Sequence, residues 1–158
     1  MNYKEVYEQV KDISGWLDEL DVEQFSKLDL PDNATILELG TFCGKSTRAL
    51  QMLFPTAEIT TCDTTTNNPE IEGVSFQKIS SMEIQWDKEI DLLFVDSSHD
   101  YEGTVLEIKR FKPFIKKGGY IVLHDYYLTG VGQAVDEMLP ESEKVHTGDF
   151  SQAIWRNE

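Results

Sequence analysis

Positive charge is scarce in this chain of 158 residues. Lys and Arg number 14 against 29 Asp and Glu, so the formal net charge at pH 7 is -15. A surface this acidic repels a phosphate backbone unless its few positive side chains cluster strongly. We therefore expect no nucleic-acid partner.

Long apolar runs and a secretory signal are missing as well. No stretch approaches the roughly 20 apolar residues of a transmembrane helix, and the N-terminal segment MNYKEVYEQVKD lacks the basic and apolar regions of a signal peptide. We expect a cytoplasmic protein with no membrane partner. The two cysteines, Cys43 and Cys62, lack metal-ligand spacing and are expected to be small, reduced, buried side chains.

Two common nucleotide-binding motifs are absent. Gly40 and Gly44 are separated by three residues, which matches neither the G-x-G-x-x-G dinucleotide fingerprint nor the Walker A loop. This spacing disfavours nucleoside triphosphates and an NAD-dependent oxidoreductase.

The composition is that of a packed domain, with 40% hydrophobic and 11% aromatic residues. The length suits one domain over residues 1–158, with a helical N-terminal segment at 1–30 and a core at 34–158. Apolar residues recur at three- and four-residue steps from Tyr3 to Leu20, which predicts one amphipathic helix. Trp16, Trp86 and Trp155 are expected to pack in the core or at its edge.

Beyond residue 34, short apolar strands alternate with helices, which indicates an α/β fold with a mostly parallel sheet. The expected strands are Ala34–Leu39, Glu58–Cys62, Val74–Ile79, Ile90–Val95 and Tyr120–Leu123, and the expected helices are Lys45–Leu53, Tyr101–Phe111 and Gln133–Leu139. Glu143–Thr147 and Gln152–Arg156 are predicted to form a closing antiparallel hairpin.

Gly40 and Gly44 lie where the first strand turns into the first helix of this core. Glycine permits close approach of a ligand, and amides at a helix N-terminus attract an anionic group. Asp63 follows the second strand, from where a carboxylate can bind ribose hydroxyls. Ordinary turns and strand ends would explain the same residues, so this pairing alone leaves both interpretations open.

Asp96 and Asp125 each follow an apolar strand directly and are expected at carboxyl strand ends, where doubly wound sheets bind ligands. Either acid alone could cap a helix or a turn. With His99 and His124 nearby, four titratable groups gather at one edge, which favours a functional site.

These segments resemble a known superfamily. The run ILELGTFCGKST is similar to the first motif of class I S-adenosylmethionine methyltransferases, and DLLFVDSSHDYEGT and KKGGYIVLHDYY are similar to their fourth and fifth strand regions. The last two resemble the small-molecule and sugar O-methyltransferase branch related to macrocin O-methyltransferase and cephalosporin hydroxylase-like proteins. The resemblance implies a Rossmann-like, doubly wound, mostly parallel seven-stranded sheet whose C-terminal hairpin is antiparallel.

The resemblance also implies roles in binding S-adenosylmethionine. Asp63 would bind the ribose hydroxyls, and Ser81 and Met82 would border the adenine. Ser46 would hold the carboxylate of the methionine part. The loop beneath the methionine part would be formed by Glu38, Gly40, Thr41 and Gly44.

Metal-dependent relatives hold magnesium with acids after the fourth and fifth strands, which correspond here to Asp96 and Asp125. Oxygen ligands suit such a hard cation, which would orient and acidify a substrate hydroxyl. Sugar-modifying relatives carry two adjacent acids after the fifth strand, where this chain has His124 and Asp125. His124 is therefore a candidate third ligand, and the departure leaves the magnesium requirement open.

His99 corresponds to a histidine that resembles the general base of the sugar branch, and an imidazole pKa of about 6.5 suits that role. A surface histidine at a helix start is the alternative. With His99 and Asp96 as catalytic residues, a substrate hydroxyl would attack the sulfonium methyl group in line. A protein that binds S-adenosylmethionine or a nucleoside without catalysis is the alternative function.

Few segments are left to enclose a small-molecule or sugar acceptor. They are the N-terminal helix, the Thr64–Gly73 loop and the Leu128–Gly132 segment. A neighbouring subunit of a homo-oligomer could complete the pocket.

Overall fold

A seven-stranded sheet forms the centre of the computed structural model, which describes residues 1–65 and 69–158. Its strands are β1 (Thr35–Leu39), β2 (Glu58–Cys62), β3 (Val74–Gln77), β4 (Ile90–Val95), β5 (Ile115–His124), β6 (Glu143–Thr147) and β7 (Phe150–Arg156). They are arranged in the order β3-β2-β1-β4-β5-β7-β6. The predicted Rossmann-like fold class is confirmed.

The strand order reverses at β1, which lies between β2 and β4. Neighbouring strands from β3 to β5 run parallel, whereas β7 runs antiparallel to both β5 and β6. In sheets of this kind a crevice opens at the carboxyl ends beside the switch point. The topology therefore directs the segments after β1 and β4 to one shared edge.

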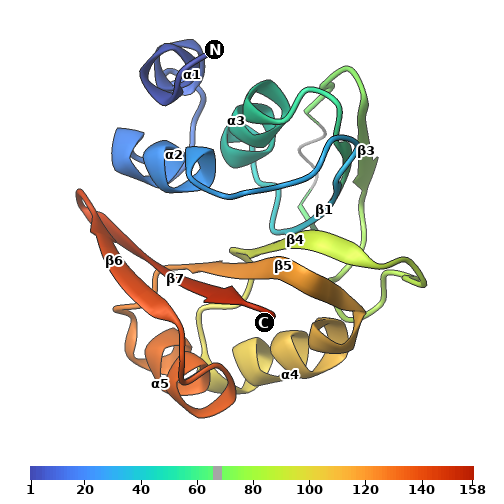
Figure 1. Cartoon of the computed structure of the whole chain (residues 1–158), viewed down its shortest axis with the longest axis vertical. Helices are drawn as coiled ribbons and strands as arrows, with labels where there is room; N and C mark the ends of the chain where they lie inside the picture. Colours follow the sequence, from blue (N-terminus) through green and yellow to red (C-terminus); the bar gives the residue numbers. More distant parts are fainter. Residues whose placement is uncertain (66–68) are drawn as a thin grey trace.

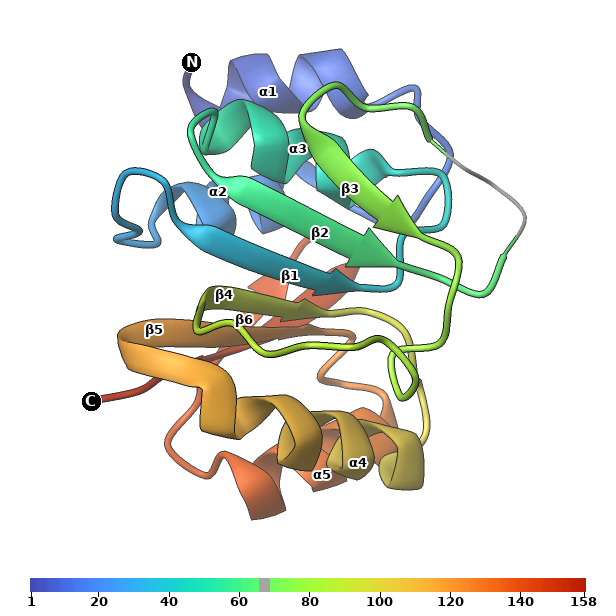
Figure 2. The ribbon, with the colours of Figure 1, turned by 90° about the vertical axis from the view of Figure 1, so that its right-hand side faces the viewer.

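Helices cover both faces of the sheet (Figures 1 and 2). They are α1 (Tyr3–Val10), α2 (Glu19–Ser26), α3 (Lys45–Leu53), α4 (Tyr101–Phe111) and α5 (Thr129–Met138). The first three lie on one face and α4 and α5 on the other. Because both faces are covered, every residue of β4 is buried, which explains why all of them except Asp91 are apolar.

The prediction of one helix from Tyr3 to Leu20 is wrong. α1 ends at Val10, and α2 begins after Asp18, whose backbone N–H donates to the Asp21 carboxylate at 2.8 Å. Gly15 lies between them with φ 145°, outside helical geometry. The apolar spacing runs through the break because Val10, Leu17 and Val22 enter the same core.

Several further boundaries differ from the prediction, among them three at β5, β3 and α5. β5 begins at Ile115 instead of Tyr120, and β3 ends at Gln77 instead of Ile79. α5 begins at Thr129 instead of Gln133, although it contains two glycines, residues of low helix propensity. A Cβ at Gly130 would lie 2.7 Å from the Tyr101 backbone nitrogen, so close packing against α4 requires this glycine.

None of the helices in the described residues is long and apolar enough to cross a membrane.

Candidate active site

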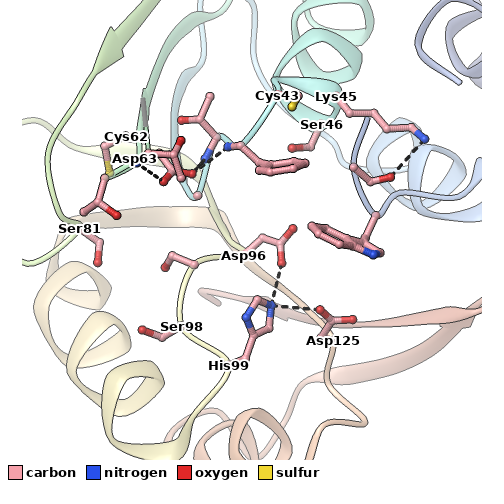
Figure 3. Close-up of a pocket in the computed structure, with 18 of the residues that line it drawn as sticks. Cys43, Lys45, Ser46, Cys62, Asp63, Ser81, Asp96, Ser98, His99 and Asp125 are labelled. Carbon is pink, nitrogen blue, oxygen red and sulfur yellow. Dashed lines mark hydrogen bonds and ion pairs between the residues drawn. The ribbon is translucent and has the colours of Figure 1, made fainter. Parts of the chain in front are cut away.

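A cleft of about 740 Å³ opens at the carboxyl ends of β1, β2, β4 and β5 (Figure 3). Its size lies within the range of small-molecule sites. Both Cys43 and Cys62 line it; Cys62 is buried as predicted, whereas Cys43 is only partly buried. The cleft brings together eight of the residues predicted from the sequence: Gly40, Thr41, Ser46, Asp63, Ser81, Asp96, His99 and Asp125.

Four other predicted site residues do not line the cleft. Gly44 is the N-cap of α3 and has φ 82°, in the left-handed region that favours glycine. Glu38 and His124 are buried beneath the cleft floor, and Met82 is 41% exposed on the outside. Gly44, Glu38 and His124 could therefore contribute to the site only indirectly. The position of Met82 does not support its expected contact with the adenine.

The glycine loop is shaped by the neighbouring strand end. Gly40 has φ 99°, and a Cβ there would lie 2.2 Å from the Asp96 backbone oxygen. The close approach of the ends of β1 and β4 therefore leaves no room for a side chain at this position. The Asp96 backbone N–H donates to the Leu39 carbonyl at 2.8 Å, which holds the two segments together.

Asp63 holds the same loop from the end of β2. Its Oδ2 accepts hydrogen bonds from the backbone N–H groups of Thr41 at 2.9 Å and Phe42 at 2.8 Å, and its Oδ1 accepts from Thr65 at 3.0 Å. Phe42 has φ 47°, a conformation that costs energy in a bulky residue and needs such support. A carboxylate has about four acceptor positions, so Asp63 keeps capacity for a ligand hydroxyl.

Glu38 accepts three hydroxyl hydrogen bonds beneath the loop. The donors are Ser46 at 2.5 Å, Thr61 at 2.6 Å, and Thr47. Burial raises the pKa of Glu38 to about 7, although the three donors favour its charged form. Ser46 therefore directs its hydroxyl hydrogen inward, towards Glu38, and joins α3 to β1.

The opposite wall carries two carboxylates and an imidazole (Figure 3). His99 Nε2 lies 3.5 Å from Asp96 Oδ1 and 3.2 Å from Asp125 Oδ2, so it bridges the ends of β4 and β5. Asp125 has φ 59°, a left-handed conformation that aspartate tolerates better than most residues. Backbone strain of this kind is concentrated at functional sites.

Both carboxylates act on the charge of His99. The hydrogen bonds that His99 donates to Asp125 and then to Asp96 raise its pKa to about 10, against the effect of partial burial. In the same cluster His124 and His99 hold the pKa of Asp125 below its ordinary value, although burial acts in the opposite direction. With this pKa, His99 is protonated at neutral pH.

His124 lies behind this wall with a fully buried side chain. Its Nδ1 lies 3.5 Å from Asp96 Oδ1 and 3.4 Å from Asp125 Oδ2. One potential ligand atom from each of Asp96, His124 and Asp125 lies within 4.8 Å of the others. The three residues that the sequence nominated for a metal ion are therefore brought together.

Glu107 on α4 is a cleft residue that the sequence analysis missed. It is 1% exposed, and its Oε1 accepts hydrogen bonds from Ser81 at 2.6 Å and from Ser97. Its Oε2 makes no hydrogen bond with any residue that the structure describes, and burial raises the pKa of the Glu107 carboxyl group. A glutamate on an amphipathic helix ordinarily faces solvent, so no local sequence signal marked it.

An apolar rim was also missed. The prediction that Trp16 packs in the core or at its edge is wrong, because it is 65% exposed and lines the cleft. Its ring centroid lies 5.3 Å from that of Phe42. Leu128 and Phe150 line the cleft as well. Trp16 and Leu128 come from two of the three segments expected to enclose an acceptor. The third, residues 64–73, contributes Thr64 and Thr65, and its residues 66–68 lie outside the described residues.

The family of the chain follows from its central part. The model of a family described as a methyltransferase domain matches residues 37–126, which is more than half of the 158 residues. The chain belongs to this methyltransferase family. The matched segment contains both the glycine loop and the Asp96–Asp125 wall, whereas α1 and α2 lie outside it.

Among individual proteins, the uncharacterized protein R132 of Acanthamoeba polyphaga mimivirus is 40% identical over 37 residues, which cover 23% of this chain and 17% of that protein. The structure of MycE from the mycinamycin biosynthetic pathway, in complex with Mg, SAH and mycinamycin VI, matches with a TM-score of 0.73 at 14% identity and covers 100% of this chain and 56% of that chain. The structure of the O-methyltransferase NovP matches with a TM-score of 0.66 at 15% identity and covers 88% of this chain and 80% of that chain. At these identities, the structural likeness shows the fold alone.

Proposed function

We propose that the chain transfers the methyl group of S-adenosylmethionine to a hydroxyl group of a small molecule or sugar. The observation that carries this proposal is the arrangement of a glycine loop, an acid after β2 and an acid–imidazole wall around one cleft. The first two features suit the donor, and the wall suits an acceptor hydroxyl. Membership of a methyltransferase family supports the assignment.

The donor would lie along the ends of β1, β2 and β4. Its methionine part would contact the loop at Gly40 and Thr41, and its ribose hydroxyls would donate to the spare acceptor positions of Asp63. The adenine would then reach the floor formed by Ile79, Ser81 and Glu107. The unpaired Oε2 of Glu107 suits the adenine amino group, because that group is the hydrogen-bond donor on the base.

The acceptor would lie between the acid–imidazole wall and the apolar rim. Trp16, Phe42 and Leu128 offer apolar surface for the body of a small molecule, while His99 and Asp96 face its hydroxyl group. The net charge of -15 disfavours an RNA acceptor. This point needs an experiment, because other proteins of similar fold are described as ribosomal RNA methyltransferases or as an N-methyltransferase.

His99 would receive the proton of the acceptor hydroxyl, but only after losing its own. Its pKa of about 10 reflects the hydrogen bonds that it donates to the two carboxylates. A positive charge bound beside Asp96 and Asp125, including the sulfonium of the donor, would lower that pKa towards neutrality. The reaction would then consist of in-line transfer of a methyl group from sulfur to oxygen, with the proton moving to His99 Nε2.

The protonated state of His99 also favours the second candidate function, binding of S-adenosylmethionine without catalysis. An imidazolium cannot act as a base. The two functions differ in one measurement, the transfer of labelled methyl groups to an acceptor.

Magnesium is implied by the MycE complex, whose structure holds it. The residues here do not fit that ion well, because the cluster combines two carboxylates with an imidazole, whereas magnesium prefers oxygen ligands in near-ideal octahedral geometry. The steps above therefore use the side chains alone.

Calorimetric titration with S-adenosylmethionine and S-adenosylhomocysteine, followed by labelled methyl transfer to panels of sugars, phenols and RNA, tests the proposed function. We expect 1:1 binding and transfer to a hydroxyl acceptor that is lost in His99→Gln. The surface variant Glu143→Gln serves as control. Absence of binding at millimolar ligand would exclude both candidate functions, and binding with no transfer to any acceptor would favour the second.

A further inference from the structure

A buried carboxylate from the N-terminal segment reaches the back of the acid–imidazole wall. Asp21 on α2 is fully buried, and its Oδ2 lies 3.3 Å from Nε2 of His124 at the end of β5. The two residues are separated by 103 positions in the sequence. Asp21 also lies outside the segment that matches the methyltransferase family.

Asp21 is held in place by further contacts. Its Oδ1 accepts from Gln152 Nε2 at 3.0 Å, and its Oδ2 accepts from the backbone N–H of Asp18 at 2.8 Å. A carboxylate fixed in this way favours a hydrogen atom on His124 Nε2. The other ring nitrogen, Nδ1, then faces Asp96 and Asp125 at the cleft.

His124 Nδ1 is buried and makes no hydrogen bond within residues 1–65 and 69–158. Its separations of 3.5 Å from Asp96 Oδ1 and 3.4 Å from Asp125 Oδ2 lie within ion-pair distance. Donor atoms about 2.1 Å from a tetrahedral metal ion lie roughly 3.4 Å apart. The two distances from His124 Nδ1 therefore match a shared metal ion of that geometry, and the ligand atoms of the three residues all lie within 4.8 Å of one another.

We propose that Asp96, His124 and Asp125 bind a divalent transition-metal ion such as zinc in preference to magnesium, with Asp21 as the outer partner of His124. An imidazole donor favours zinc and similar ions, whereas magnesium favours oxygen donors alone. Metal-bound histidines characteristically donate their second ring N–H to a carboxylate, which is the contact between His124 and Asp21. Three protein ligands leave a coordination position open towards the cleft.

His99 stays outside this ligand set. It contacts the same two carboxylate oxygens, but its side chain is 50% exposed, whereas that of His124 is fully buried. A metal ion between the carboxylates would offset the charges that raise the pKa of His99. Zinc binding at these three donors does not itself depend on methyl transfer.

The test is calorimetric titration of chelator-treated protein with zinc chloride and with magnesium chloride, in the absence of S-adenosylmethionine. We expect one zinc ion per chain, bound at least about 100-fold more tightly than magnesium. His124→Asn keeps a polar side chain but leaves only oxygen donors, so it should remove the preference for zinc. Asp125→Asn should weaken zinc binding. Asparagine is chosen because it tolerates the left-handed backbone conformation at this position.

Asp21→Asn tests the outer partner and should weaken zinc binding about 10- to 100-fold. Glu19→Gln on the same helix is the matched control and should leave zinc affinity unchanged. Because Asp21 is buried, the unfolding transition of each metal-free variant is measured first. If Asp21→Asn does not fold, the shift in unfolding temperature with added zinc in wild type and in Asp125→Asn decides the question, since only a ligand that binds the folded state raises it.

Three results would overturn the metal assignment: no zinc binding, magnesium bound as tightly as zinc, or zinc binding that survives both His124→Asn and Asp125→Asn. A parallel titration with S-adenosylmethionine separates this assignment from the proposed function. Zinc binding without donor binding would refute methyl transfer alone, and donor binding without zinc would refute the metal site alone.

Discussion

Replacing Glu38 by Gln should change how the free energy of unfolding depends on pH. Burial raises the pKa of Glu38 to about 7 from an ordinary value of 4.5. Between these two values the folded chain keeps a proton that the unfolded chain releases. The stabilisation contributed by protonated Glu38 is therefore complete below about pH 4.5 and is lost as pH rises through about 7.

The expected magnitude follows from the difference in pKa. One pKa unit corresponds to about 1.4 kcal/mol, so integration between pH 5 and pH 8 gives a loss of about 2–3 kcal/mol from Glu38. Glu38 is fully buried, so solvent screening does not reduce this value. The variant lacks the titrating group. As pH rises over the same interval, its free energy of unfolding should therefore increase by about this amount relative to that of wild type.

Urea unfolding of wild type and Glu38→Gln at several values between pH 5 and pH 8 measures the effect. Other titrating groups, including His99 and His124, are shared by both proteins and cancel in the difference. Glu143→Gln, at an exposed residue, should give a curve parallel to wild type. If the curves of wild type and Glu38→Gln are parallel as well, Glu38 does not carry the raised pKa.

Three further predictions concern the cleft. Asp63→Asn should weaken S-adenosylmethionine binding at least about 10-fold in calorimetry, because the variant loses an acceptor that either the loop amides or the ribose requires; unchanged affinity would refute the ribose role. Glu107→Gln should weaken binding about 5- to 100-fold by offering a donor to the adenine amino group, and wild-type affinity would remove Glu107 from the adenine site. In wild type, methyl transfer should rise with pH across the neutral range, since only deprotonated His99 accepts a proton and its pKa is about 10. His99→Gln should lower the rate at least about 100-fold and lose this pH dependence, while a variant with an unaltered pH profile would exclude His99 as the base.

The wall of the cleft could be predicted from the sequence to a large extent. Asp96 and Asp125 follow apolar runs that are long enough for buried strands, and parallel strands bring their carboxyl ends to one edge. This reasoning correctly placed both acids and His99 together. It did not distinguish His99, which faces the cleft, from His124, which lies behind it, because that difference depends on the direction of each side chain.

The N-terminal segment shows the opposite case. Its apolar spacing predicted one continuous helix, and the capping that separates α1 from α2 was missed. Asp21 lies at a helix start, where an acid commonly caps the helix. Its contact with His124 joins residues 103 positions apart and left no local pattern to detect.

Hydrophobic periodicity and turn residues are local properties of the chain, so they predicted the alternation of strands and helices, the sheet type and the acids at its carboxyl ends. Packing between segments established that Glu38 and His124 face inward, that Glu107 reaches the cleft and that Asp21 contacts His124. Each of these depends on which helix covers which face of the sheet (Figure 1), a matter of packing between segments distant in sequence.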